Sequence, residues 1–338
     1  MRALSVAEPW GLDAIQVVEA PDPVLNQGEV LVRMRAVSLN YRDLLMVQGM
    51  YARGAATGGA ITPFSDGCGT VEAVGPGVSR LKPGDRVATM FFQNWISGPP
   101  TLEKLLSSLG SPIPGAGREL GVFSQEGLSK VPDFLSDQQV ATLPCAALTA
   151  WRALFEDADL RPGDAVVLQG TGGVSIFGLQ FAHAAGLRTL ITSSSDEKLA
   201  RAKAMGADHV ANYRLEPAWS KAVRAATGGV GADLIIEVGG GGTIDESMKA
   251  IRIGGHVAIV GVVAGLGGPF NTASLIGNSA KLQGLSVGSR DMFEAMCRFI
   301  DLHKIGPVVD KVFPWTEAKA AFTAMQRGEH FGKIVLEF

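Results

Sequence analysis

At 338 residues, the chain is too long for one ordinary hydrophobic core and too short for three, so we expect two domains. With 46% hydrophobic and 19% charged residues and no low-complexity stretch, the composition excludes a largely disordered protein. The net charge of −3 and the pI near 6.0 give no sign of a basic surface for phosphate backbones, so we expect no nucleic-acid partner.

The chain carries no sequence signal for a membrane or for secretion. No apolar run reaches the roughly 18 residues of a membrane span, and the N-terminus begins with a strand-like segment. The three cysteines, Cys68, Cys145 and Cys297, are odd in number, widely spaced and without a Cys-x-x-Cys pair. This usage suits a reducing compartment and supplies no structural zinc site, so we expect a cytoplasmic protein.

Residues 1 to about 120 have the pattern of a β-rich domain. Apolar and polar residues alternate in 29–37 and 69–75, and glycine and proline bound these short runs, which predicts a barrel or sandwich. Between Phe91 and Gly117 the pattern breaks into aromatics, prolines and glycines, with one short helix expected at 102–109. We expect this stretch to form a surface excursion or lid.

The pattern changes from Asp164 onward. Apolar, β-branched runs alternate there with alanine-rich helical stretches, and the runs are 165–168, 189–192, 233–238 and 256–260. Strands that are apolar on both faces belong to a parallel sheet covered by helices, so this half is predicted to be a doubly wound α/β nucleotide-binding domain. After Gly288, helices around 292–300 and 316–327 and a strand at 333–336 are expected to complete the first domain.

A glycine turn follows the first of these strands and precedes a helix. It reads Gly170-Thr171-Gly172-Gly173-Val174-Ser175, a Gly-x-Gly-x-x-Ser version of the dinucleotide-binding fingerprint. Glycines let the backbone approach a pyrophosphate, and the N–H groups at the helix start stabilise its charge. The position of this turn in a repeating βα pattern makes the prediction specific, because the motif alone is weak.

The end of the second strand distinguishes NADPH from NADH. An acidic residue there would bind the ribose 2′-hydroxyl of NAD, but the strand ends in Thr192-Ser193-Ser194-Ser195 and Lys198 follows. Hydroxyls and a lysine suit a 2′-phosphate, so NADPH is the expected cofactor and NADH the less favoured one. Asp196 is expected to cap the next helix.

Several motifs resemble those of a known family. They are Val74-Gly75-Pro76-Gly77-Val78, Lys82-Pro83-Gly84-Asp85-Arg86-Val87, the glycine turn, the segment 205–213 and the C-terminal segment 330–336. The chain resembles the medium-chain dehydrogenase/reductase superfamily and, within it, the zinc-independent quinone oxidoreductase-like branch. The resemblance implies a β-rich GroES-like substrate domain at 1–145 and 289–338 and a Rossmann domain with a doubly wound parallel sheet at 146–288.

The resemblance also implies the cofactor-binding residues. In NADPH-using relatives a lysine and a tyrosine hold the 2′-phosphate, which here correspond to Lys198 and Tyr213. The nicotinamide lies against strand ends, mostly through backbone groups, and a basic residue lies close to the pyrophosphate. The implied cofactor site comprises Gly170, Thr171, Gly172, Gly173, Val174, Ser193, Ser194, Lys198, Tyr213, Gly239, Gly261, Val262, Val263, Ser286, Val287 and Lys333.

Zinc-dependent alcohol dehydrogenases of this superfamily need an early cysteine, a Gly-His-Glu element and a further cysteine. Here the early segment 38–43 has no cysteine, Ser65-Asp66 replaces His-Glu, and only Cys145 falls at a ligand position. The five histidines lie on Rossmann elements or near the C-terminus, where structural roles are expected. We therefore expect no metal site.

Reduction of an already electrophilic carbon needs no metal. The implied reaction is hydride transfer to a small-molecule substrate, a quinone or an α,β-unsaturated carbonyl compound, with hydrogen-bond donors stabilising the oxyanion. The candidate catalytic residues are Asn40, Tyr41 and Thr149, and the candidate substrate pocket contains Phe64, Trp95 and Cys145. Simple packing is as good an interpretation of Trp95, and Asp43 and Asp66 are expected to be structural.

Two other functions stay open. One is an alcohol or aldehyde dehydrogenase that uses NAD(P), and the other is a nicotinamide-binding protein with little turnover, such as a sensor. The resemblance further implies a homodimer that pairs Rossmann sheets edge to edge through the last strand, at 281–287.

Overall fold

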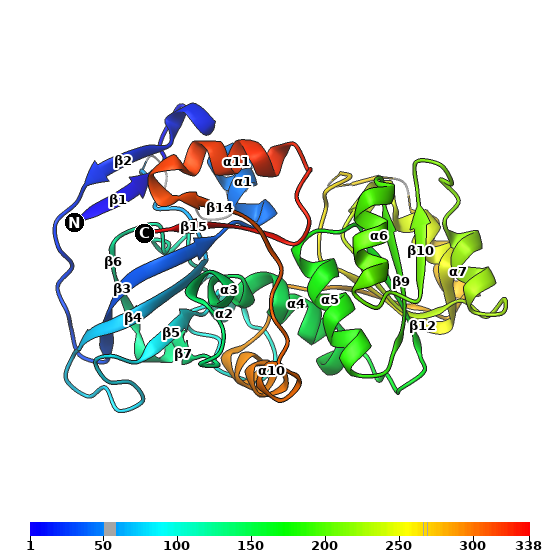
Figure 1. The fold of residues 1–338 in the computed structure, drawn as a ribbon, viewed down its shortest axis with the longest axis horizontal. Coiled ribbons are helices and arrows are strands. Elements are labelled where there is room, and N and C mark those ends of the chain that lie inside the picture. The colour runs from blue at the N-terminus through cyan, green and yellow to red at the C-terminus, as the bar shows by residue number, and fades with distance from the viewer. Residues whose placement is uncertain (51–58, 266, 269) are drawn as a thin grey trace. The chain divides into compact units, whose positions relative to one another are not determined.

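The computed structural model describes residues 1–50, 59–265, 267–268 and 270–338, which form two compact units. Unit 1 comprises Met1–Leu148 and Gly288–Phe338, and unit 2 comprises Thr149–Val287. Unit 1 is a β-rich GroES-like domain and unit 2 contains a six-stranded parallel sheet, so the fold is α/β with a Rossmann domain (Figure 1).

The main sheet of unit 1 is built around a long strand. Its order is β14-β15-β3-β4-β5-β7, with β6 also paired to β3; the strands are Val309–Pro314 (β14), Lys333–Glu337 (β15), Glu29–Ser38 (β3), Asp66–Val74 (β4), Arg86–Thr89 (β5), Leu128–Lys130 (β7) and Leu120–Ser124 (β6). Strands Arg2–Ser5 (β1) and Gln16–Glu19 (β2) form a separate pair. Ser38 at the end of β3 lies opposite both Asp66 and Val335. This register brings the start of β4, the end of β3 and β15 together.

Helices cover the sheet of unit 1 and close its core. They are Tyr41–Val47 (α1), Asp137–Ala141 (α3), Arg290–His303 (α10) and Ala318–Gln326 (α11), whereas the short helix Leu102–Leu105 (α2) has no buried residue. Helix α11 packs beside α1 (Figure 1), and its Phe322 stacks on Phe64 with ring centroids 5.5 Å apart. Within the described ranges, none of the helices has both the length and the apolar character needed to cross a membrane.

The two ends of segment 91–118 are packed into unit 1, whereas residues 96–106 are mostly exposed, so the surface excursion that we expected is confined to this middle part. Phe91, Phe92 and Trp95 are all buried, and the guanidinium of Arg42 lies 4.7 Å from the Phe91 ring centroid. The expected helix is shortened to α2, because the chain then turns so that the backbone N–H of Leu109 donates to Phe91 O at 3.0 Å. Aromatic burial holds this segment in place where regular secondary structure is scarce.

The sheet of unit 2 has the strand order of a dinucleotide-binding fold. Its six parallel strands run in the order β10-β9-β8-β11-β12-β13, and they are His209–Asn212 (β10), Arg188–Ser193 (β9), Ala165–Gln169 (β8), Ala232–Glu237 (β11), Ile251–Ile259 (β12) and Lys281–Gly284 (β13). β8, β9 and β10 form one half of the sheet and β11, β12 and β13 the other, so the two halves meet between the neighbouring strands β8 and β11. The carboxyl ends of these two central strands are where such folds bind ligands.

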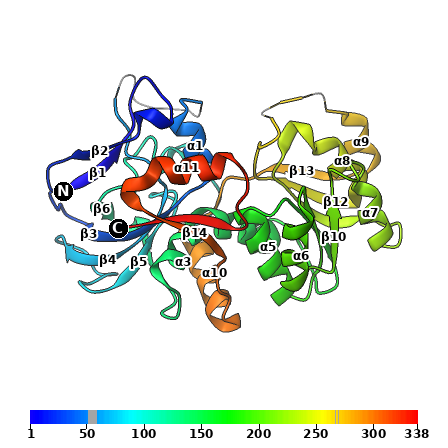
Figure 2. The ribbon, with the colours of Figure 1, turned by 45° about the horizontal axis from the view of Figure 1, so that its top comes forward.

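Both faces of this sheet are covered. Figure 2 shows Gly173–Ala184 (α5) and Asp196–Ala204 (α6) on one face and Ser220–Ala226 (α7) and Ile244–Ala250 (α8) on the other. A further helix, Thr272–Gly277 (α9), precedes β13. Every residue of β8 is buried, so its continuous apolar run is explained by burial from both sides.

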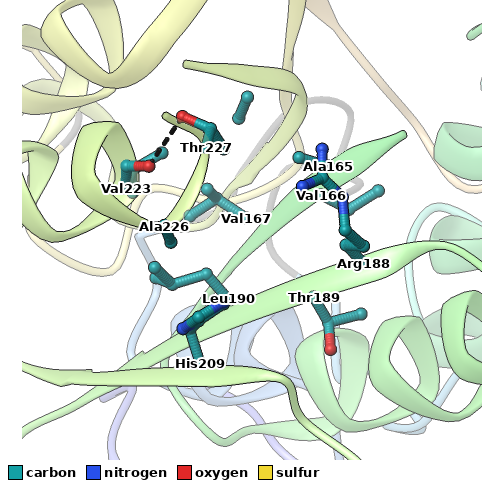
Figure 3. A pocket seen from close by; sticks show the side chains of 11 residues that line it. Ala165, Val166, Val167, Arg188, Thr189, Leu190, His209, Val223, Ala226 and Thr227 are labelled. Carbon is teal, nitrogen blue, oxygen red and sulfur yellow. Dashed lines mark hydrogen bonds between the residues drawn. The ribbon is translucent and has the colours of Figure 1, made fainter. Parts of the chain in front are cut away.

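A small apolar cavity lies at the amino ends of four strands of unit 2. Ala165, Arg188, His209 and Ala232, the first residues of β8, β9, β10 and β11, line it together with Val223 and Thr227 of the α7 region (Figure 3). Because it lies at the opposite end of the strands from the glycine turn, this cavity is not the dinucleotide site.

His256 is a buried histidine without a hydrogen-bond partner among the described residues. It lies on β12, is 6% exposed, and neither ring nitrogen is paired. Burial, reinforced by the charge of Lys281, lowers the pKa of His256 from 6.5 to about 4. The folded protein therefore holds this side chain neutral at pH values where the unfolded chain protonates it.

This burial predicts a specific acid sensitivity. The stability that depends on neutral His256 is fully present above pH 6.5 and is lost as the pH falls toward 4, by about 2 kcal/mol at pH 4.5. We expect His256→Leu to remove about that much of the difference in unfolding free energy between pH 7 and pH 4.5, as measured by urea denaturation. The matched control is His209→Leu at an exposed position, and equal pH profiles for the His256 variant and the wild type would contradict the prediction.

Candidate functional site

The glycine turn is shaped for a phosphate group. Gly170 has φ +72°, and Gly172 is the N-cap of α5 with no side chain over the helix start. An added Cβ at either glycine would meet no atom within 4 Å, so the backbone there faces open space. The first intrahelical bond runs from Ile176 N–H to Gly172 O at 3.0 Å, which leaves the N–H groups at the helix start available to an anion.

The structure explains the serine in the last position of the motif. Ser175 is buried, and its hydroxyl donates to Gln169 O, which ties α5 to the end of β8. The close contact of helix and strand lies at Gly178, where an added Cβ would lie 2.8 Å from Leu168 Cδ2. The glycine that allows close helix packing is therefore displaced along the helix from its usual place in the fingerprint.

The predicted 2′-phosphate residues lie at the ends of β9 and β10. The backbone N–H of Tyr213 donates to Ser193 O at 3.1 Å, and the Tyr213 side chain is 41% exposed. Lys198 lies in the first turn of α6. The N-cap of α6 is Ser195 and not Asp196; the Asp196 carboxylate instead accepts from Asn212 Nδ2 at 2.7 Å. Asp196 thus braces β10 and is not the cap we expected.

The other predicted cofactor residues of unit 2 lie after β11, β12 and β13. Backbone bonds join the loop that contains Gly239 to the loop that contains Gly261, Val262 and Val263, as from Val263 N–H to Val238 O at 3.1 Å. Val287 has φ +41°, a strained conformation for a β-branched residue, and Arg152 donates to Ser286 O at 3.1 Å. Thr149 is buried at the start of unit 2.

Unit 1 contains a buried polar cluster that joins three of the predicted site residues, Asn40, Cys145 and Lys333, to Asp66. The Lys333 ammonium donates to Leu39 O and to Asn40 Oδ1, the latter at 2.6 Å. The Asn40 amide nitrogen points to Ser65 Oγ at 3.4 Å. The predicted role of Lys333 beside a pyrophosphate stays a prediction, and the contacts observed for it lie within unit 1.

Asp66 connects this cluster to Cys145. Its carboxylate accepts from Ser65 Oγ at 2.7 Å and from the backbone N–H of Cys145 at 3.0 Å. Cys145 lies in a π-helical turn, Leu143–Ala147, next to Pro144. Such a turn interrupts the regular helical ladder, and here the Cys145 N–H is directed to the carboxylate.

Burial governs the electrostatics of the cluster. It raises the pKa of Asp66 and lowers the pKa of Lys333, and in each case the opposite charge of the other residue works against the shift. Burial also raises the pKa of Asp43 to about 6, against the nearby Arg42, and raises the pKa of the Cys145 thiol, so the thiolate is strongly disfavoured. The cluster therefore stabilises one buried cation among carboxylates.

The remaining candidates of unit 1 have different surroundings. Tyr41 is 38% exposed at the start of α1. Phe64 is fully buried with φ +74°, and Gly115 packs so closely that an added Cβ would lie 2.2 Å from Pro63 O. This strained, close-packed backbone fixes the start of Ser65-Asp66. Trp95 is buried too and donates to Gly98 O at 2.8 Å, which agrees with the packing interpretation.

Sequence reasoning missed two buried polar residues of unit 2. Gln169 and Glu237 are the last residues of β8 and β11, and their side chains meet at 2.6 Å. The signal was a polar residue that ends each of two otherwise apolar strands. Asp66 was expected to be structural, and its bonds to Ser65 and Cys145 agree with that expectation.

Two family profiles match the chain. The profile of the alcohol dehydrogenase GroES-like domain matches residues 26–133, and that of the zinc-binding dehydrogenases matches residues 173–301. A zinc-type alcohol dehydrogenase-like protein of Schizosaccharomyces pombe is 42% identical over 97% of this chain and 96% of its own length. The chain belongs to the medium-chain dehydrogenase/reductase superfamily. It is an NAD(P)-dependent oxidoreductase of that superfamily.

Other members of the superfamily are also similar over the whole chain. The structure of a putative alcohol dehydrogenase from Sinorhizobium meliloti 1021 is 40% identical, covers 100% of both chains and has a TM-score of 0.90. A mycobacterial protein solved with NADPH is 28% identical, with 100% coverage of both chains and a TM-score of 0.84. A quinone oxidoreductase of Rattus norvegicus is 28% identical over 99% of this chain and 97% of its own length. Alcohol dehydrogenase-like relatives are thus more similar than this quinone oxidoreductase.

The zinc that these names imply does not fit the residues of the cluster. A catalytic zinc ion takes three side-chain ligands, and residues 1–50, 59–265, 267–268 and 270–338 contain no group of three His, Cys, Asp or Glu that would hold a metal. Residues 51–58, 266 and 269 include none of these four residue types. The cluster offers one thiol with a raised pKa and one carboxylate beside an ammonium, which repels a metal cation.

The mutual dependence of the buried charges can be measured. Lys333 and Asp66 form no direct ion pair, but each of Lys333→Met and Asp66→Asn removes one of two opposite buried charges that influence each other and is expected to lower the unfolding free energy by about 3 kcal/mol. The double variant is expected to lose at least about 1 kcal/mol less than the sum, as measured by urea denaturation.

The exposed pair Lys304–Asp301, 2.7 Å apart, provides the control for this cycle. Lys304→Met and Asp301→Asn should be nearly additive, because exposed ion pairs contribute about 1 kcal/mol or less. Additive effects for Lys333 and Asp66 would show that their charges do not depend on each other.

Proposed function

We propose that this protein is a zinc-independent, NADPH-dependent oxidoreductase that transfers hydride to a quinone or an α,β-unsaturated carbonyl compound. The observation that carries the proposal is the buried polar cluster of Asn40, Asp66, Cys145 and Lys333. In this cluster the positive charge comes from the Lys333 ammonium. Oxidation of a simple alcohol requires an activated alkoxide, for which a metal is the usual source. An enone or quinone is already electrophilic and needs no such activation.

The residues of unit 1 have the properties that such a reduction requires. NADPH supplies the hydride, and hydrogen-bond donors must then stabilise an enolate-type oxyanion. Lys333 binds Asn40 Oδ1, which fixes the amide so that its nitrogen remains a donor. Tyr41, which is 38% exposed, carries a hydroxyl that is the second candidate donor, and Thr149 of unit 2 is the third. Phe64, Trp95 and Cys145 remain the predicted lining of the substrate pocket.

The chemistry of the β9 and β10 ends supports NADPH over NADH. Ser193, Ser194, Lys198 and Tyr213 carry hydroxyl and ammonium donors, and the carboxylate of Asp196, the first acidic residue after β9, is bonded to Asn212. A 2′-phosphate needs donors and positive charge, whereas a ribose 2′-hydroxyl is usually bound by a free carboxylate. The mycobacterial relative of 28% identity was solved with NADPH.

Alcohol or aldehyde oxidation with NAD(P) is the second candidate. It is favoured by the names of the relatives, since the Schizosaccharomyces pombe and Sinorhizobium meliloti proteins, at 42% and 40% identity, are described as alcohol dehydrogenase-like or putative alcohol dehydrogenases. The rat quinone oxidoreductase is 28% identical. A nicotinamide-binding protein with little turnover is the third.

We also propose a homodimer in a reducing compartment, the cytoplasm. Strand β13 forms one edge of the described Rossmann sheet, and an unpaired strand edge favours pairing with a second copy. All three cysteines are free thiols, which fits a reducing compartment.

The 2′-phosphate assignment predicts the cofactor preference. By fluorescence titration, wild-type protein should bind NADPH at least tenfold more tightly than NADH. We expect Lys198→Ala to weaken NADPH binding roughly tenfold, because a charge-assisted hydrogen bond is lost, and Tyr213→Phe to weaken it less. NADH binding should stay within twofold in both variants.

Lys203→Ala, on the same helix, is the matched control and should leave NADPH binding unchanged. If NADH binds as tightly as NADPH to the wild type, the cofactor assignment is wrong and alcohol or aldehyde oxidation with NAD(P) gains support.

Metal removal tests the reaction class. After dialysis against a chelator, we expect reduction of enones or quinones with NADPH to keep at least half of its rate, and metal analysis to find less than about 0.1 zinc per chain. Primary alcohols and aldehydes are assayed in the same series. Loss of activity that returns with Zn2+, together with alcohol oxidation, would favour the dehydrogenase candidate. Tight NADPH binding with slow turnover on every substrate would favour the third candidate, a nicotinamide-binding protein with little turnover.

A further inference from the structure

We propose that Glu237 is a positioning residue for the nicotinamide half of the bound dinucleotide, an inference that rests on the proposed function. Glu237 is the last residue of β11, and its side chain is completely buried. A carboxylate inside an apolar sheet is unfavourable unless hydrogen bonds compensate its lost hydration. Its place at the carboxyl end of a central strand indicates what those hydrogen bonds hold together.

Five donors converge on the Glu237 carboxylate. Oε1 accepts from the backbone N–H groups of Gly239 at 2.8 Å and Gly240 at 3.0 Å and from the Thr243 hydroxyl at 2.5 Å. Oε2 accepts from Gln169 Nε2 at 2.6 Å and from the Ser247 hydroxyl at 2.5 Å. These donors come from the loop after β11, from α8 and from the end of β8. The carboxylate therefore fixes the loop and the neighbouring strand end with one group.

Gln169 extends this connection to the phosphate-binding turn. It directly precedes Gly170, and its Oε1 accepts from the backbone N–H groups of Val238 at 3.2 Å and Gly239 at 3.3 Å. Its amide nitrogen donates to Glu237 and to Ser247 Oγ at 2.8 Å. Both ends of the amide are used, so its orientation is fixed and the two strand ends are held in register.

The loop that Glu237 holds is in turn packed against the loop after β12. Ala264 N–H donates to Gly239 O at 2.8 Å, and Gly241 N–H donates to Gly265 O at 3.2 Å. An added Cβ at Gly241 would lie 2.4 Å from Gly267 O, so the two backbones are in direct contact. A shift of the Glu237 loop is therefore transmitted to Gly261, Val262 and Val263, which are predicted to face the nicotinamide.

The adenine half is bound elsewhere on the sheet. Ser193, Lys198 and Tyr213 follow β9 and β10, which lie on the other side of β8 from β11 and β12. No contact described for Glu237 reaches these elements. The two halves of the dinucleotide should therefore respond differently when Glu237 is changed.

The test compares NADPH with 2′,5′-ADP, which carries the 2′-phosphate but no nicotinamide, by calorimetric titration. In Glu237→Gln one acceptor becomes a donor that faces other donors. We expect the Kd of NADPH to rise at least tenfold while that of 2′,5′-ADP changes less than twofold. Adding Gln169→Glu exchanges the two ends of the hydrogen bond and should restore the Kd of NADPH to within threefold of the wild type. Glu216→Gln, at an exposed position, is the matched control and should change neither.

Equal weakening of both ligands, no weakening of either, or no rescue by the exchange would overturn the inference. If circular dichroism shows that Glu237→Gln does not fold, Thr243→Val and Ser247→Ala take its place in the test, since each removes one hydroxyl donor to the Glu237 carboxylate. A threefold or larger rise in the Kd of NADPH alone is then expected, and no selective rise would overturn the inference. If the wild type binds neither NADPH nor NADH, the proposed function fails and this inference falls with it.

Discussion

The compensation of buried charge is the constraint on which both units of this protein depend. In unit 2 the Glu237 carboxylate is tolerated because five donors reach it, and those donors are the backbone and side chains of loops that would otherwise end in unpaired N–H groups. A parallel sheet concentrates such loops at its carboxyl edge. One carboxylate can therefore order the edge that a dinucleotide must meet, and the glycines around it are needed because the backbones touch.

In unit 1 the buried charge that must be compensated is a cation, the Lys333 ammonium. The Lys333 ammonium enters from β15, the last strand, and binds groups that follow β3, while Asp66 at the start of β4 supplies the compensating charge. The register that pairs Ser38 with both Asp66 and Val335 makes this meeting possible. Segments from the beginning, the middle and the end of the chain thus converge on one polar cluster, which makes it sensitive to the fold of the entire unit.

The sequence was sufficient for those features that depend on local pattern. Apolar runs gave the strands of the parallel sheet, and the glycine turn was located from its neighbours at 165–178. The observed contacts of Lys333, Gln169 and Glu237 were not predicted, because their partners are 68 to 294 residues away and no periodicity marks such contacts. The burial of Phe91 was not predicted for a related reason: it comes from tertiary packing, as in the contact of Arg42 with Phe91, and not from any regular element.

Membership of a superfamily whose names mention zinc does not by itself determine the chemistry of this chain. The scaffold is retained from end to end, as a TM-score of 0.90 to an alcohol dehydrogenase-like structure shows. The reaction depends instead on which groups stand at a few positions. Where zinc-dependent members need soft ligands, this chain has Asn40, Ser65 and Asp66 with one thiol that burial keeps protonated. A positive charge is nevertheless present, as Lys333, and it holds a hydrogen-bond donor in place. An ammonium orients and attracts but does not activate an alcohol as a metal does, and this difference is the reason for proposing substrates that are already electrophilic.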